Sequence, residues 1–337
     1  MAYTALYRKW RPARFEDVRG QEHIVRTLKN QIISDRVGHA YLFCGTRGTG
    51  KTTIAKIMAR AVNCEHPVDG SPCNECAVCR SILEGRSVNV AEIDAASNNG
   101  VDNIREIRDQ VQYSPTEGKY RVYIIDEVHM LSAGAFNALL KTLEEPPAHA
   151  VFLLLAERAG AFLPTILSRV VVMKIRPLSA ETIADYLMQA GHLAEESHIL
   201  SAYAQGRIGQ ALELVEDEGF REMRQDILGK LEVLPSMSEG DAYLLAKDLE
   251  GYKNDLRFLD IMELWYRDLL TAKSLREEGY LIQRDKKDAI FRAAKEPAAL
   301  LAKKAAAVRT ARMRLAQNAN FRLTMEVMLM DLKETGK

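Results

Sequence analysis

The sequence has few aromatic residues, few cysteines and no net charge. Only 7% of its 337 residues are aromatic, five are cysteine, and 46 lysines and arginines balance 46 aspartates and glutamates. Zero net charge excludes a protein that is basic over its whole surface, although it leaves room for a local basic patch. The chain is 47% hydrophobic, which excludes intrinsic disorder, and its length predicts about two or three domains.

Long hydrophobic runs are also missing. A conspicuous apolar run, Val151 to Ala156, has six residues, far fewer than the roughly 18 that a membrane-spanning helix needs. The first twelve residues are charged and aromatic and do not resemble a signal peptide. We therefore expect a cytoplasmic protein without membrane contact. Its cysteines are then reduced, and a cluster of them is expected to bind metal rather than form disulfides.

The hydrophobic pattern divides the chain into two halves. In the first, short apolar segments alternate with helical stretches, which is typical of a parallel sheet covered by helices on both faces. Strands are expected at 40–44, 88–93, 121–125 and 151–155, and helices from 51 to about 61 and over 135–143. After Pro177 only helical patterns remain. We expect an α/β domain over 1–178, a helical domain over 179–234 and an all-helical domain over 235–337.

A glycine-rich turn follows the first expected strand and fits the pattern G-x-x-x-x-G-K-[ST]. Its glycines let backbone N–H groups surround phosphate oxygens, and the N-terminus of the following helix favours the negative charge. Lys51 is expected to reach the β- and γ-phosphates, and the Thr52 hydroxyl to bind Mg²⁺. A chance match is the less favoured alternative. The predicted nucleotide-binding residues here are Gly45, Gly48, Thr49, Gly50, Lys51, Thr52 and Thr53.

A pair of acids follows the third expected strand. Asp126 and Glu127 come where open α/β sheets place their ligands. Asp126 is expected to hold Mg²⁺, directly or through water, and Glu127 to orient and polarise the attacking water. Two acids after a strand are commonly just its solvated end. At about 75 residues beyond the phosphate loop, however, the pair indicates nucleotide hydrolysis.

Four of the five cysteines lie close together, with the spacing C-x8-C-x2-C-x2-C. The predicted ligands of one metal ion are Cys64, Cys73, Cys76 and Cys79. Two tight C-x2-C steps let thiolates converge, and the fourth completes a tetrahedron without an open position for catalysis. We favour structural zinc, and an iron–sulfur cluster is the alternative. Cys44, on the strand before the phosphate loop, is expected to be buried and inert.

Two further features of the sequence involve basic residues. Arg169, after Ser168, is a candidate arginine finger for the γ-phosphate of a neighbouring subunit, although most arginines are solvated surface charges. A second feature is a run of basic residues with Glu296 as its one acid: Arg292, Lys295, Lys303, Lys304, Arg309, Arg312, Arg314 and Arg322. This run is either a nucleic-acid footprint or, as we prefer, a solvated helix face or a subunit interface.

Together these features resemble bacterial clamp-loader subunits of the AAA+ class, most closely the gamma/tau family of DNA polymerase III. The segments that carry the resemblance are Tyr7 to Pro12, the phosphate loop, the cysteine insert at 64–79, Glu92 to Ser97 and Phe136 to Pro147. The resemblance implies an AAA+ domain with a zinc-binding insert, then a helical lid and an all-α collar. It also implies that Tyr7, Arg11 and Pro12 wrap the adenine and that Arg169 acts in trans.

Beyond residue 152 the sequence departs from the gamma/tau pattern. Glu157 stands where that family has a polar sensor of the γ-phosphate, and Val170 replaces the cysteine after the finger arginine. Gly209 stands where a second sensor arginine is expected, with Arg207 two residues earlier. This half is more similar to the delta-prime subunit of the same assembly. ATP binding is therefore implied, while the hydrolysis rate stays open, because each lost transition-state contact raises the barrier.

The function implied is that of an ATP-dependent subunit of a hetero-oligomeric clamp loader. Its expected partners are the other loader subunits, the sliding clamp and primer–template DNA, and its cofactors are ATP, Mg²⁺ and Zn²⁺. Ser97, Asn98 and Asn99 either offer donors to DNA phosphate or form an ordinary helix cap. Two alternatives stay open: a delta-prime-like scaffold that binds nucleotide statically and donates Arg169, or a helicase-type AAA+ motor. The sequence does not decide between a short gamma/tau and a true delta-prime subunit.

Overall fold

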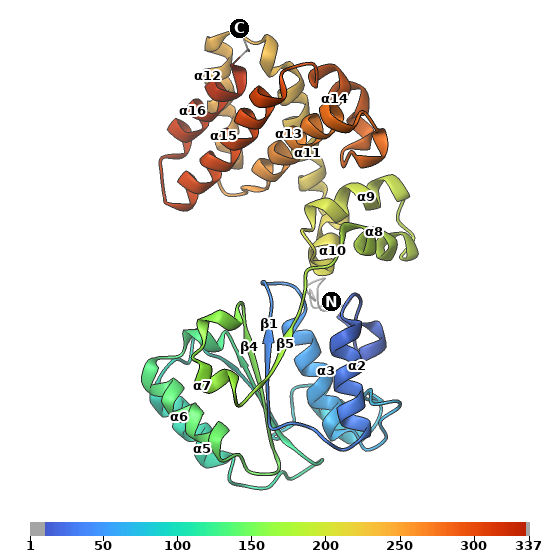
Figure 1. Cartoon of the computed structure of the whole chain (residues 1–337), viewed down its shortest axis with the longest axis vertical. Helices are drawn as coiled ribbons and strands as arrows, with labels where there is room; N and C mark the ends of the chain where they lie inside the picture. The colour runs from blue at the N-terminus through green and yellow to red at the C-terminus, as the bar shows by residue number, and fades with distance from the viewer. Residues whose placement is uncertain (1–10, 335–337) are drawn as a thin grey trace. The chain divides into compact units, whose positions relative to one another are not determined.

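The computed structural model describes residues 11–334, which form two compact units (Figure 1). Unit 1 holds the chain up to Thr182 together with Gly206–Gln210, and unit 2 holds Ile183–Gln205 and the chain from Ala211 onward. Each unit is described by itself below. The division into three domains at 178 and 234 stays a prediction. Tyr7, predicted to contact adenine, lies outside the described residues.

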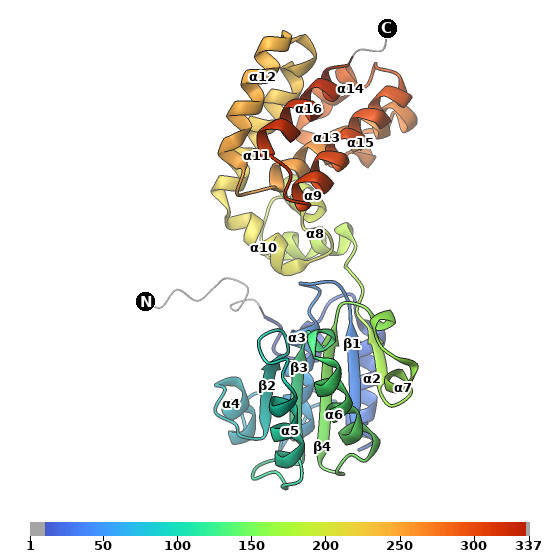
Figure 2. The same cartoon turned by 90° about the vertical axis from the view of Figure 1, so that its left-hand side faces the viewer.

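Unit 1 is built on a five-stranded parallel sheet (Figure 2). Its strands are β1 (Ala40–Cys44), β2 (Val90–Asp94), β3 (Arg121–Asp126), β4 (Ala150–Ala156) and β5 (Val171–Lys174). They lie in the order β2-β3-β4-β1-β5. The first four match the strands predicted from the sequence. The edge strand β5 was not predicted, because its four residues include an exposed Val171 and an exposed Lys174 instead of a continuous apolar run.

Helices cover both faces of this sheet, as predicted. Tyr41 and Phe43 pack on the face covered by α2 (Glu22–Ile33) and α3 (Lys51–Asn63). Leu42, Cys44 and Phe152 pack on the opposite face, which α5 (Val101–Gln110), α6 (Ala133–Glu144) and α7 (Pro164–Leu167) cover (Figure 1). Successive side chains of a strand point to opposite faces, so strands buried on both sides need apolar residues throughout. Cys44 is buried, as expected, and burial raises the pKa of its thiol.

The parallel order brings the carboxyl ends of β1, β4 and β3 to one edge of the sheet, with β4 in the middle. The N–H of Gly45, just after β1, donates to the carbonyl of Ala156 at the end of β4 (3.1 Å). Loops that follow these three strands therefore start side by side, although their residues are far apart in the sequence. A further helix, α4 (Ala77–Leu83), belongs to the cysteine insert between α3 and β2.

The rest of the described chain is helical, as predicted. The helices are α8 (Ala180–Gln189), α9 (Ala194–Tyr203), α10 (Ile208–Glu216), α11 (Glu218–Val233), α12 (Glu239–Asp248), α13 (Arg257–Leu275), α14 (Lys287–Ala293), α15 (Ala298–Ala316) and α16 (Phe321–Lys333). In unit 2, α13 carries the buried Trp265 and packs against α11, α14 and α15, while α16 packs against α12 and α15. Across residues 11–334, no helix combines the length and hydrophobicity needed to cross a membrane.

Acids of unit 2, most of them outside the run, pair with much of the basic run. Lys304 is almost fully buried and its ammonium lies 2.7 Å from Glu296. Arg312 reaches Asp260 on α13 at 2.7 Å. Three further pairs are Lys303–Glu334, Arg309–Glu263 and Arg322–Glu326. These pairs favour a role in helix packing over a nucleic-acid footprint.

A truncation in the sheet tests this packing. Phe152 is fully buried on β4 and stacks on Tyr123 of β3 with ring centroids 5.4 Å apart. Phe152→Ala is expected to lower the opening free energy of unit 1 by about 3–5 kcal/mol, because it leaves a cavity in a close-packed core. Hydrogen exchange of the β1 and β4 amides measures this loss.

The matched control is Leu163→Ala, since Leu163 is 65% exposed. It is expected to change the same amides by less than about 0.5 kcal/mol. Equal losses in the two variants would show that the assigned packing is wrong.

Candidate functional site

The phosphate loop connects β1 to α3, as the motif predicts. Gly50 is the N-cap of α3 and has φ +99°, a left-handed backbone conformation that favours glycine. A Cβ on Gly45 would lie 2.7 Å from the carbonyl oxygen of Ile175, so a larger residue does not fit there. The N-terminus of α3 thus opens onto this loop, where its unpaired N–H groups attract an anion.

The two predicted nucleotide motifs meet at the edge of the sheet. The Thr52 hydroxyl donates to Asp126 Oδ2 at 3.1 Å, although 74 residues separate them in the chain. Lys51 is only 6% exposed, and its ammonium donates to the carbonyls of Gly45 (2.7 Å) and Thr46 (3.2 Å). A hydroxyl and a carboxylate suited to Mg²⁺ therefore lie in contact next to a buried lysine.

Glu127 follows Asp126 with the positive φ of +48°, which is unusual for a residue with a side chain. Its N–H donates to Asp126 Oδ1 at 2.9 Å. Within the described part of the chain, its buried Oε2 accepts no hydrogen bond and lies 3.4 Å from His129 Nδ1. One oxygen of the carboxylate is therefore without a hydrogen-bond donor among the described residues and has His129 as its charged or polar neighbour. His129 thus lies directly beside this carboxylate.

Arg207 lies on the phosphate loop. A Cβ built on Gly48 would come within 2.8 Å of Arg207 Cδ, so the arginine side chain rests against that glycine. Gly206, with φ +81°, turns the chain just before it. The family pattern places Gly209 at the position of the second sensor. In the structure, the residue that reaches the phosphate loop is Arg207. Glu157 is exposed and directly follows β4, between the loops after β1 and β3.

Arg169 lies between α7 and β5, and its guanidinium pairs with residues outside the phosphate loop. Its guanidinium donates to the Thr165 carbonyl at 2.6 Å and lies 3.0 Å from the Glu144 carboxylate. The side chains of Arg169 and Glu144 are 34% and 42% exposed. The arginine is therefore held at the surface, where a neighbouring molecule has access to it.

The beginning of the described chain reaches α3. Arg11 Nε donates to the Thr53 hydroxyl at 3.2 Å, which brings two of the predicted binding residues together, and Pro12 follows. Sequence reasoning did not find the role of Gln21, which is buried. Its side chain donates to the Arg176 carbonyl (2.6 Å) and accepts from the Arg176 N–H (3.2 Å). This contact ties the start of α2 to the end of the α/β domain, and no local sequence pattern signals it.

The four clustered cysteines converge, as predicted. The sulfur atoms of Cys64, Cys73, Cys76 and Cys79 all lie within 4.8 Å of one another. Tetrahedral zinc with bonds of about 2.3 Å would place its sulfurs about 3.8 Å apart. N–H groups point at these sulfurs: those of Glu75 and Cys76 at Cys73 Sγ (3.4 and 3.3 Å), and that of Cys73 at Cys64 Sγ (3.3 Å). The cluster fits a four-thiolate metal site.

The thiol groups differ in acidity. Burial raises the pKa of Cys73, but the N–H groups of Glu75 and Cys76 outweigh it and lower the pKa to about 6. Burial raises the pKa of Cys64 and Cys79. A divalent ion favours the thiolate form of all four, so metal binding would release protons, among them those of Cys64 and Cys79, whose pKa burial raises.

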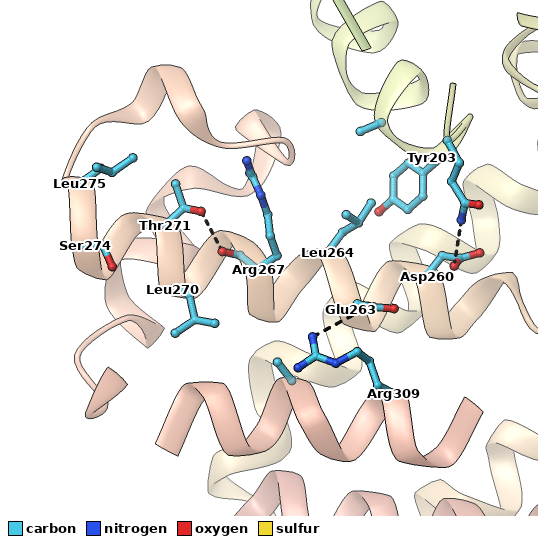
Figure 3. Close-up of a pocket in the computed structure, with 13 residues that line it drawn as sticks. Tyr203, Asp260, Glu263, Leu264, Arg267, Leu270, Thr271, Ser274, Leu275 and Arg309 are labelled. Atoms are coloured by element: carbon cyan, nitrogen blue, oxygen red, sulfur yellow. Dashed lines mark hydrogen bonds and ion pairs between the residues drawn. The ribbon is translucent and has the colours of Figure 1, made fainter. Parts of the chain in front are cut away.

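A separate hollow of about 740 Å³ lies in unit 2, between α9, α13 and α15 (Figure 3). Polar and charged residues that line it pair with one another. Arg309 lies 3.8 Å from Glu263, and Gln205 donates to Asp260 at 3.4 Å. Leu264, Leu270 and Leu275 supply its apolar part. None of the nucleotide or cysteine residues discussed above lines this hollow, so we do not assign the nucleotide site to it.

The strand order, the phosphate loop after β1 and the acid pair after β3 define unit 1 as a P-loop domain of the AAA+ class. A family model described as "DNA polymerase III, delta subunit" matches residues 20–179, and one described as "DNA polymerase III, delta subunit, C terminal" matches 218–334. The chain belongs to the family of DNA polymerase III gamma/tau subunits, and the delta-subunit models match parts of both its first and its second half.

Two tau subunits illustrate this similarity. The chain is 44% identical over 316 residues to DNA polymerase III subunit tau of Bacillus subtilis, covering 87% of this chain and 56% of that protein. It is 46% identical over 222 residues to subunit tau of Escherichia coli, covering 64% and 34%. The chain thus spans about half or less of the length of these curated relatives. Likeness to tau also extends well beyond residue 152, where we had expected the departure.

Among solved structures, a DNA polymerase III gamma subunit-related protein from Thermotoga maritima is 22% identical. The match covers 92% of this chain and 98% of that one, with a TM-score of 0.45.

The cysteine cluster generates a direct test. The chain is expected to purify with one divalent metal ion, and Cys76→Ser to lose at least nine tenths of it, because one ligand of the tetrahedron is removed. Elemental analysis after gel filtration measures the metal content. Cys44→Ala is the control, because Cys44 lies outside the cluster, and its metal content should stay unchanged. Equal metal content in Cys76→Ser and Cys44→Ala would contradict the assignment, and a coloured, iron-rich sample would favour an iron–sulfur cluster instead.

Proposed function

We propose that the chain is an ATP-dependent clamp-loader subunit of the DNA polymerase III holoenzyme, which helps to load the sliding clamp onto primed DNA. The observation that carries this proposal is the contact between Thr52 and Asp126, which unites the two nucleotide motifs at one edge of the sheet. Family membership supports the replication role, because its relatives are named as subunits of DNA polymerase III.

ATP would bind with its phosphates at the N-terminus of α3. Lys51, now bonded to loop carbonyls, would exchange them for the β- and γ-phosphate oxygens. Thr52 and Asp126 would hold Mg²⁺, which neutralises phosphate charge. Arg11, beside Thr53, supports adenine binding by the segment at 7–12. Arg207 on Gly48 would sense the phosphates from the opposite side of the loop.

Hydrolysis would use Glu127 together with a finger from the next subunit. Glu127 Oε2, which accepts no hydrogen bond in the described chain and lies beside His129, would accept one from the attacking water. Arg169 would leave Glu144 and contact the γ-phosphate bound by a neighbour, so that turnover depends on ring assembly. Catalytic roles are thus assigned to Lys51, Asp126, Glu127 and Arg169. The other loader subunits, the clamp and primer–template DNA are its proposed partners.

Zinc is our proposed occupant of the cysteine cluster, in a structural role, because four thiolates leave no position open for a reacting group. The loop at 97–99 has a weaker link to DNA. Ser97 Oγ donates to Asp94 Oδ2 at 2.6 Å, and Asn98 Nδ2 to the Asp94 carbonyl at 3.1 Å. Since these side chains already fold their own loop, we favour local capping as their main role.

The second candidate is a scaffold subunit that binds nucleotide without turning it over. The observation in its favour is Glu157, an exposed carboxylate at the end of β4, where it would repel the γ-phosphate instead of contacting it. A scaffold would still donate Arg169 to its neighbour. The helicase-type motor has no specific observation in its favour.

Two substitutions separate the motor from the scaffold. In the reconstituted loader, Lys51→Ala is expected to abolish ATP binding by this subunit and to lower clamp-stimulated ATP turnover by at least tenfold. The reason is that Lys51 is the only positive side chain assigned to the β- and γ-phosphates from within the motif. Steady-state phosphate release with clamp and primed DNA measures the effect.

The companion variant is Arg169→Ala. Its ATP affinity should stay within about twofold of the wild-type value, while turnover should fall by about 10²–10³-fold, as it does when a transition-state contact is removed. Near-normal clamp loading by Lys51→Ala, with loading lost in Arg169→Ala, would establish the scaffold instead. Failure of the wild-type chain to bind ATP at all would overturn both.

A further inference from the structure

The cysteine insert holds the chain segment that leads into the nucleotide site. Asn74, between Cys73 and Cys76, donates from Nδ2 to the Ala13 carbonyl at 3.1 Å. The Ser71 hydroxyl accepts the N–H of Phe15 at 3.3 Å. The same hydroxyl donates to the Glu16 carboxylate at 2.8 Å, and Arg14 reaches the Cys73 carbonyl at 3.4 Å. Four consecutive residues, 13–16, are thus each bonded to the insert.

Arg60 of α3 bonds both to this segment and to the insert. Its Nη2 donates to the Ala13 carbonyl at 2.9 Å and its Nε to Asn74 Oδ1 at 3.1 Å. Arg60 is only 5% exposed, and no carboxylate of residues 11–334 forms an ion pair with it. A buried cation without a counter-charge is costly. Four thiolates around one divalent ion carry a net negative charge, so a metal-filled cluster supplies the compensation that Arg60 lacks.

The same segment continues to the nucleotide motif. Arg11 bonds to Thr53, and Ala13 bonds to Arg60, seven residues further along α3. Residues seven apart lie on the same face of a helix, two turns from one another. Residues 11–13 therefore run along one face of α3, from its phosphate-binding end towards the cysteines. The insert and the nucleotide site are connected by one short stretch of backbone.

We propose that the metal-loaded insert positions residues 11–16 along α3 and thereby sets the affinity of the chain for adenine nucleotide. Asn74, Ser71 and Arg60 are the positioning residues. None of them is assigned a contact with the nucleotide itself. This inference rests on the proposed function in one respect, that the N-terminal segment contacts the adenine. It gives the insert a role beyond its own local stability.

Asn74→Gly tests the proposal without touching a metal ligand. Asn74 has φ +62°, a conformation that glycine adopts without strain, so the substitution removes two hydrogen bonds and keeps the backbone. We expect unchanged zinc content and ATP binding weakened by about 3- to 10-fold, the loss of one to two net hydrogen bonds. Calorimetry with Mg-ATP and elemental analysis on the full chain measure the two quantities. Chelation of the metal from the wild-type chain should weaken ATP binding at least as much.

Glu75→Ala is the matched control, because Glu75 is the next residue and its side chain is exposed. It should leave both zinc content and ATP affinity unchanged. A second readout is hydrogen exchange of the amides at 13–17, which is expected to speed up in Asn74→Gly and in the chelated protein, and not in Glu75→Ala.

The outcomes distinguish this inference from the proposed function. If Asn74→Gly keeps its zinc, binds ATP as tightly as the wild-type chain and shows unchanged exchange at 13–17, this inference is wrong. The proposed function would not be affected by that result. No ATP binding by the wild-type chain would overturn the proposed function, while faster exchange at 13–17 would still support the anchoring. If Asn74→Gly loses its metal, Ser71→Ala replaces it as the test, because Ser71 lies outside the C-x2-C loops. The same affinity and exchange measurements then apply to Ser71→Ala.

Discussion

The arrangement of the nucleotide site depends on the contact between the Thr52 hydroxyl and the Asp126 carboxylate. Parallel pairing imposes this contact, because β4 lies between β1 and β3 and sets the distance between the loops that follow them. Strand β4 ends at the same edge of the sheet, so the residue after it, Glu157, stands between the phosphate loop and the acid pair. This position is set by the strand order and not by the type of side chain. A substitution at that position changes the charge that the γ-phosphate would meet, without disturbing Thr52 and Asp126, the proposed magnesium ligands. In the proposed site, nucleotide binding and nucleotide turnover are therefore separable.

The sequence predicted those parts of the site whose geometry is local. The phosphate loop needs glycine at defined backbone angles, as at Gly50, and the cysteine loops need a fixed spacing, so both leave a pattern that can be read directly. The contact of Arg207 with the phosphate loop could not be predicted from a local pattern. It comes to Gly48 through the turn at Gly206, and counting along the helix put the expected arginine two residues too late. The bonds between Gln21 and Arg176 join positions 155 residues apart and leave no sequence pattern at all.

The basic run from 292 to 322 shows a different limit of sequence reasoning. Counted along the chain, it has a single acid, and it resembles a charged face. In the folded helices, Asp260 and Glu263 of α13 approach from another part of the chain and pair with Arg312 and Arg309. Lys304 is buried against Glu296, eight residues before it. Charge balance within unit 2 is reached between helices, so local counts of charge overestimate how much of it faces a partner.

Two arginines of unit 1 show that burial decides whether a contact is permanent or can be exchanged for another partner. Arg60 is only 5% exposed, so any loss of its partners leaves a buried charge, and in the proposal above a metal-filled cluster beside it balances that charge. Arg169 and Glu144 are both more than one-third exposed, and a pair of this kind contributes about 0–1 kcal/mol. A phosphate group carried by a neighbouring subunit offers a stronger, bidentate partner. Under the proposed role of Arg169, this weak pair would hold the arginine at the surface and release it when a neighbouring subunit binds ATP.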